Sequence, residues 1–210
     1  MPLHSCHPIA PHAKLKLTET YVSSLMMERA VDAVMRRVQK LDREHDIPYL
    51  AGYSTNGKII YIDRDMPTGF LHNGKMFQTD PFLILHEEVE KTLIDQLGLH
   101  YLHAHQIATR AEEAAVRAAG HSWKVYDDFM QENVTKIGAK PLANVPADLD
   151  LKPYRDEHDH DILQRMAKSV ERGEHPEGYH KDELRARIAA VHAEHKAHVA
   201  AKTAAVTKAK

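Results

Sequence analysis

The sequence lacks most of the features that identify a functional class. Its 210 residues include a single cysteine, Cys6, which excludes a disulfide framework and a cysteine-rich zinc module. Lys and Arg total 28 against 30 Asp and Glu, and this net charge of −2 leads us to expect no nucleic-acid partner. No apolar run approaches the roughly 18–20 residues that a membrane span needs, so we expect no membrane partner either. Glycine-rich phosphate loops and the G-x-S-x-G nucleophile motif are also missing.

The beginning of the chain gives no targeting signal. Residues Met1–His12 lack the basic segment followed by an apolar segment that is typical of a secretory leader. A single cysteine also gives no indication of an oxidising compartment. We therefore expect a cytoplasmic protein.

Histidine is the residue that the chain has in excess. There are 17 histidines, and histidine is the commonest metal ligand and the side chain that titrates near neutral pH. The question is whether any of them are placed together with other ligand-type side chains.

The sequence pattern predicts a mostly helical protein with one small β region. Two short β-rich segments flank Asn56-Gly57, a strong hairpin signal, and the loop 69–81 has the residues for a second short hairpin at His72–Lys75. Apolar periodicity and capping residues predict the helices 18–44, 81–97, 100–119, 122–135, 154–172 and 181 to the end.

These elements define a fold class and a domain plan. We expect an α+β fold, mainly α, in which a small antiparallel β-hairpin or sheet packs on a helical core with a C-terminal helical extension. The plan divides the chain into an irregular N-terminal arm (1–17), an α+β core (18–137), a linker (138–153) and the helical extension (154–210). The arm and the lone terminal helix are typical of segments that rest on a neighbour, which predicts a protein partner or self-association through residues 1–16 and 181–210.

The helix 81–97 places two ligand-type residues on its apolar face. At about 100° per residue, His86 and Glu90 fall in the middle of the stripe of large apolar side chains. Glu87 lies at the edge of this stripe, whereas we expect Glu88 and Lys91, like Asp95, to face water. Burying an imidazole and a carboxylate together is costly unless something pairs them.

The helix 100–119 offers a matching pair. A face of small alanines permits close helix approach, and His105 and Glu112 lie at its border. Two consecutive helices joined by a short turn usually pack antiparallel, which would bring His86, Glu90, His105 and Glu112 to one seam. Such a set predicts a metal site. A metal-free network of His86 with Glu90 or Glu112 is the alternative.

The segment His86-Glu87-Glu88-Val89-Glu90 resembles the H-E-x-x-H helix of the zincin metallopeptidases, with Glu90 in place of the second histidine. The resemblance covers about residues 49–120. It implies His86, Glu90 and His105 as ligands of a divalent metal, zinc first, with iron or manganese as alternatives. It also implies Glu87 as the base that takes a proton from the attacking water. Glu112 would be a fourth ligand or would support His105.

Other histidine clusters favour simpler interpretations. His103 is expected in solvent because it points away from His105, and the acidic 157–161 tract is typical of a polar first helical turn. The clusters at 4–12 and 192–198 have no evident scaffold. Two hypotheses remain: a zincin-like metal-dependent hydrolase acting on a peptide or amide carbonyl, or a non-catalytic helical assembly protein with a structural metal site or a buried His/Glu network.

Overall fold

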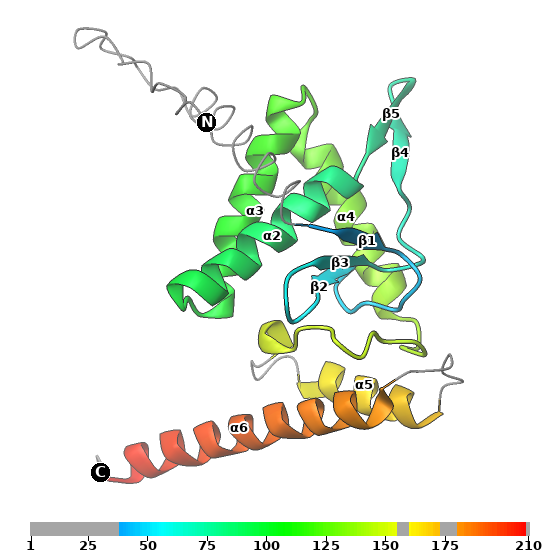
Figure 1. Ribbon diagram of the computed structural model, residues 1–210. Helices are drawn as coiled ribbons and strands as arrows, with labels where there is room; N and C mark the ends of the chain where they lie inside the picture. The colour runs from blue at the N-terminus through cyan, green and yellow to red at the C-terminus, as the bar shows by residue number, and fades with distance from the viewer. Residues whose placement is uncertain (1–37, 155–159, 173–179, 209–210) are drawn as a thin grey trace, which may run out of the picture.

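The structure is a computed structural model that describes residues 38–154, 160–172 and 180–208 (Figure 1). The described chain has an α+β fold that is mostly helical, with five α-helices, a mixed three-stranded sheet and a two-stranded sheet. The predicted fold class is therefore confirmed. The predicted N-terminal arm and the cluster at residues 4–12 lie outside the described residues. None of the described helices combines the length and the apolar character that a membrane span requires.

The three-stranded sheet has the order β1-β3-β2. Strands β2 (Ala51–Tyr53) and β3 (Ile59–Ile62) form the predicted antiparallel hairpin, and Gly57 in the connecting turn has a φ of 69°. Strand β1 (Lys40–Asp42) pairs in parallel with β3, so the sheet is mixed rather than purely antiparallel.

Strand β1 corrects the prediction of a helix over residues 18–44. The part of that range which the structure describes, from residue 38 onward, contains no helix. The backbone N–H groups of Gln39 and Lys40 both donate to the carbonyl of Lys58, which draws this segment alongside β3. Pairing with a distant strand therefore outweighs the local helical periodicity.

The second hairpin is formed by β4 (Gly69–His72) and β5 (Lys75–Gln78). Asn73 and Gly74 both have positive φ, 49° and 74°, as the two central residues of a type I′ turn require. The predicted option of a hairpin within the loop 69–81 is confirmed, and this hairpin projects from the body in Figure 1.

Three helices cover one face of the mixed sheet. Helices α2 (Asp80–Leu97) and α3 (Tyr101–Ala118) form a helical hairpin, and α4 (Trp123–Gly138) follows. Gly98, in the left-handed conformation, ends α2. The predicted small-residue face of α3 is confirmed, because Ala104 and Ala108 are fully buried.

The other side of the sheet packs on the C-terminal part of the chain. Short helix η1 (Lys152–Tyr154), α5 (His160–Arg172) and α6 (Lys181–Lys208) contribute to an apolar cluster that includes Tyr61 of β3. Ile60 and Ile62 point into the opposite cluster, with α2, α3 and α4. Successive side chains of β3 point to opposite faces of the sheet, so this strand packs against a helical layer on each side.

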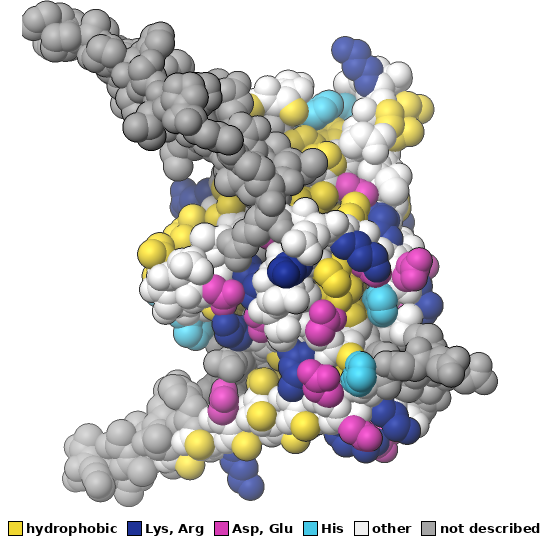
Figure 2. Space-filling view, viewed as in Figure 1, with side chains coloured by type: hydrophobic (Ala, Val, Ile, Leu, Met, Phe, Trp, Pro, Cys, Tyr) yellow, Lys and Arg dark blue, Asp and Glu magenta, His cyan; other side chains and the backbone are white. Residues whose placement is uncertain are grey.

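The segment predicted as a linker, 138–153, contributes to this core. Its apolar side chains are buried against α5 and α6; they are Leu142, Val145, Leu149 and Leu151. The division into domains stays a prediction. Helix α6 runs past the body in Figure 1, and acidic and basic side chains are interspersed over the face shown in Figure 2.

Candidate metal centre

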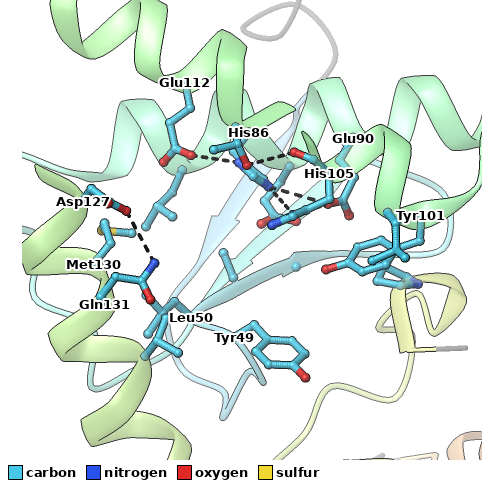
Figure 3. Close-up of a pocket in the computed structure, with 18 of the residues that line it drawn as sticks. Tyr49, Leu50, His86, Glu90, Tyr101, His105, Glu112, Asp127, Met130 and Gln131 are labelled. Carbon is cyan, nitrogen blue, oxygen red and sulfur yellow. Dashed lines mark hydrogen bonds and ion pairs between the residues drawn. The ribbon is translucent and has the colours of Figure 1, made fainter. Parts of the chain in front are cut away.

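Helices α2 and α3 bring three ligand-type side chains together at their seam. His86 and Glu90 lie one turn apart on α2, and only 7% and 3% of their surfaces are exposed. His105 reaches the same point from α3, and its side chain is 46% exposed (Figure 3). Among the described residues this is the only group of three or more His, Cys, Asp or Glu with the geometry to hold a metal ion.

The three donor atoms have the spacing of a single metal shell. His105 Nδ1 lies 3.1 Å from His86 Nε2 and 3.0 Å from Glu90 Oε2, and the third distance, from His86 Nε2 to Glu90 Oε2, is 3.6 Å. Donors held about 2.0–2.1 Å from one tetrahedral zinc lie roughly 3.3 Å apart. These distances are close enough for one cation to contact all three donors, and two imidazoles with one carboxylate suit zinc, iron or manganese.

Glu112 contacts the other nitrogen of His86. Its Oε2 atom lies 2.8 Å from His86 Nδ1, and its Oε1 atom accepts a hydrogen bond of 2.5 Å from the hydroxyl of Tyr126. The structure thus brings Glu112 to the site, but against His86 and not against His105. A carboxylate on Nδ1 fixes the imidazole tautomer that leaves Nε2 free to bind a metal.

Glu90 is supported in a similar way. Its Oε1 atom accepts a hydrogen bond of 3.1 Å from the hydroxyl of Tyr53 on β2, which leaves Oε2 to face the two imidazoles. Sequence reasoning did not predict these roles of Tyr53 and Tyr126. Neither tyrosine has a local signal, because each lies in a different element from the carboxylate that it contacts.

The surroundings of the site favour a cation. Burial alone lowers the pKa of His86, but the charge and hydrogen bond of Glu112 outweigh burial and raise this pKa well above its ordinary value. Burial raises the pKa of Glu90, but hydrogen bonds with His105 and His86 bring it below its usual range. The buried carboxylates therefore stabilise positive charge here, whether a proton or a metal carries it.

Glu87 lies beside this group and lines the same pocket. Only 8% of its surface is exposed, and no residue of the described ranges donates a hydrogen bond to its carboxylate. Burial, with the nearby charge of Glu90, raises the pKa of Glu87 to about 8. A cation held by the neighbouring ligands would lower this value.

The prediction that Glu88 and Lys91 face water is wrong. Glu88 is 3% and Lys91 1% exposed, and the segment after α4 packs against Lys91. The ammonium group of Lys91 lies 2.9 Å from Asp150 and 2.8 Å from Asp95, and 4.7 Å from the centre of the Tyr53 ring. A buried ion pair thus joins α2 to the segment before η1.

The three grouped side chains His86, Glu90 and His105, called the metal-type group below, border a pocket of about 420 Å³. Its walls come from α2, α3, α4, the start of β2 and the segment 150–154. Figure 3 shows His86 and His105 between Met130 of α4 and Tyr101 of α3. Tyr49 enters the pocket from the residues before β2, where its φ is +59°. Such a conformation is uncommon for a bulky residue and is often found at functional sites.

Two other candidate histidines, which the structure describes, do not join this site. His103 is exposed, as predicted, and the side chain of His100 accepts a hydrogen bond from the backbone of Leu102 at the start of α3. Most of the tract at 157–161 lies outside the described residues.

Comparison with models of known families, with curated proteins and with solved structures finds no match for this chain.

Proposed function

We propose that this protein is a metal-dependent hydrolase that cleaves a peptide or amide bond. His86, Glu90 and His105 would hold the cation, zinc in the first instance with iron or manganese as alternatives, and Glu87 would act as the base. Glu112 would position His86.

The observation that carries this proposal is that the three donors border an open pocket and not a closed core. Structural zinc sites are usually closed by four protein ligands, whereas catalytic sites keep a position for water. Three donor atoms are grouped here, and Glu112 is engaged with the far nitrogen of His86. The partly exposed His105 forms the side that opens toward the pocket.

The position of Glu87 suits proton transfer. A divalent metal would supply the lowered pKa of a water molecule and polarise the substrate carbonyl. Glu87 would take a proton from the attacking water as the water oxygen bonds to the carbonyl carbon. As the C–N bond breaks, Glu87 would deliver this proton to the leaving nitrogen, so that one water would be consumed per bond cleaved.

The second candidate function is that of a helical assembly protein. In it, the His/Glu group at the seam of α2 and α3 is a structural metal site or a metal-free network. The observation that favours this function is that the carboxylates of the group have hydrogen-bond partners in the protein without a metal. Glu90 has partners in His105 and Tyr53, and Glu112 has partners in His86 and Tyr126. Association through residues 1–16 and 181–210 stays a prediction.

Metal analysis of the protein as purified separates these functions first. The hydrolase requires close to one equivalent of a transition metal, or a thermal shift when zinc is added. Less than a tenth of an equivalent together with no shift would leave only the metal-free network.

The variant Glu87→Gln then tests catalysis, with Glu88→Gln as a matched control one residue along the same helix but outside the pocket lining. We expect Glu87→Gln to keep its metal and to lose hydrolysis of a pool of internally quenched peptides, while Glu88→Gln keeps both. A parent protein that holds metal but cleaves nothing would favour the structural role.

A further inference from the structure

One arm of the pocket extends from the metal-type group along α4. Its apolar lining here consists of Trp123, Met130 and Val134 from one side of α4, with Leu83 of α2 and Leu50 beside β2. Leu83 and Leu50 are 5% and 2% exposed, and they belong to the core cluster beneath this arm.

This arm is continuous with the proposed metal position. Leu83 lies one turn before His86 on α2, and Tyr126, which holds Glu112, lies one turn before Met130 on α4. A substrate whose carbonyl lies at the three donors must therefore place an adjacent group against these apolar side chains.

The polar residues of α4 lie at the edge of the arm. Asp127 and Gln131 line the same pocket, and the side-chain amide of Gln131 donates a long hydrogen bond of 3.4 Å to Asp127 (Figure 3). Beside these two polar residues, the apolar part of the α4 lining, Trp123, Met130 and Val134, offers dispersion contacts, including those of the soft thioether of Met130.

We propose that the α4 wall, formed by Trp123, Met130 and Val134, is a subsite of the proposed hydrolase. It would bind a large apolar side chain of the substrate, such as that of Phe, Leu or Met, next to the bond that is cleaved. This inference rests on the proposed function, because the metal-type group is what places the substrate. It goes beyond that function by assigning the preferred side chain and the residues that select it, with Val134 and Met130 as the specificity-determining positions.

The test uses hydroxamates, which bind an accessible zinc ion, and measures affinity and not turnover. Three probes are titrated into the zinc-loaded protein by calorimetry: acetohydroxamate, and two amino-acid-type hydroxamates that carry either a methyl or a benzyl side chain. We expect the benzyl probe to bind about 10-fold or more tightly than the methyl probe, since even one methylene in an apolar pocket is worth roughly 10–200-fold.

Two matched variants locate the effect. Val134→Trp fills the arm, and it should abolish the advantage of the benzyl probe while acetohydroxamate binds as in the parent. Val125→Trp makes the same change about half a turn out of phase on the same helix, at a half-buried position outside the pocket lining, and should keep the advantage. Zinc content and thermal unfolding verify that both variants are folded.

The results distinguish failure of the apolar subsite from failure of the proposed hydrolase function. Equal affinity for the benzyl and methyl probes in the parent protein overturns the subsite but leaves the hydrolase intact, and this result needs no variant to fold. An unchanged benzyl advantage in folded Val134→Trp overturns the assignment to α4. If acetohydroxamate itself fails to bind the zinc-loaded protein, the open metal position is refuted and the proposed function fails with the subsite.

Discussion

Replacing Tyr126 by Phe removes a single oxygen atom and none of the three grouped donors, yet we expect zinc binding to weaken about 10- to 100-fold. The hydroxyl of Tyr126 donates to Glu112, and Glu112 in turn holds Nδ1 of His86 at 2.8 Å. Tyr126 is fully buried and Glu112 is 6% exposed. Water is therefore poorly placed to replace the missing donor, and Glu112 loses part of what orients it against His86.

One hydrogen bond to a charged group contributes about 1.5–3 kcal/mol. The bond exists with and without zinc, so its loss should lower the free energy of unfolding of the metal-free protein by about this amount and does not by itself change zinc affinity. The expected change in affinity, about 10- to 100-fold, is that of losing a group that orients a metal ligand. Zinc affinity falls in addition because His86 is less firmly held in the tautomer that presents Nε2.

Both quantities are measurable, and the chain offers a matched control. Zinc affinity is obtained by competition with a chromophoric chelator, and stability by urea unfolding of the metal-free protein. Tyr61→Phe removes a hydroxyl that donates to Asp148 at 2.5 Å on the other face of the sheet. That variant should lose stability but keep its zinc affinity. If Tyr126→Phe binds zinc as tightly as Tyr61→Phe does, the support of His86 through Glu112 is refuted.

Three further changes test other parts of the structure. His105→Ala should abolish zinc binding in the chelator assay, and normal affinity would show that this side chain is not a ligand. Lys91→Met should lower the free energy of unfolding by about 3–5 kcal/mol in urea, because it leaves Asp150 buried without its ammonium partner; a loss below 1 kcal/mol would contradict this. Burial raises the pKa of Asp42, but hydrogen bonds from Lys40 and its other neighbours outweigh burial and hold the pKa below its usual range. The stability that this carboxylate contributes is therefore complete above its unfolded-state pKa and is lost as the pH falls through the folded pKa. In urea unfolding, Asp42→Asn should be less stable than the parent protein near neutral pH, and this difference should shrink toward pH 2. A difference in stability that does not change with pH would contradict the lowered pKa of Asp42.

Helix phase is what made the centre of the site predictable. The apolar stripes of two consecutive helices specify which faces meet, so His86, Glu90, His105 and Glu112 could be assigned to one seam from the sequence. Phase says nothing about what packs on the far side of a helix, and there the prediction failed for Lys91. Its partner Asp150 lies 59 residues away, in a segment whose composition is typical of a linker.

The support of the ligands could not be predicted for the same reason. Tyr53 and Tyr126 each reach a carboxylate on another element, and only the packing of β2 and α4 on the helical hairpin brings them there. Strand β1 shows the same limit in the backbone, since it pairs in parallel with β3, and the connection between these two strands includes β2. Local periodicity thus predicts the elements and their faces, whereas contacts of long sequence separation decide the rest.

Glu87 is the residue whose role differs between the proposed hydrolase and a protein with a purely structural metal site. A structural metal site needs its ligands and their hydrogen-bond partners, and Glu90 and Glu112 already have both. Glu87 has neither role: within the described residues its carboxylate is buried beside two other acids without a donor, and burial raises its pKa to about 8. Glu87 lines the pocket, and a titratable side chain with a perturbed pKa in a cleft is a candidate functional residue. The position of Glu87 at the pocket is therefore a feature that the proposed hydrolase uses and that a purely structural metal site does not need.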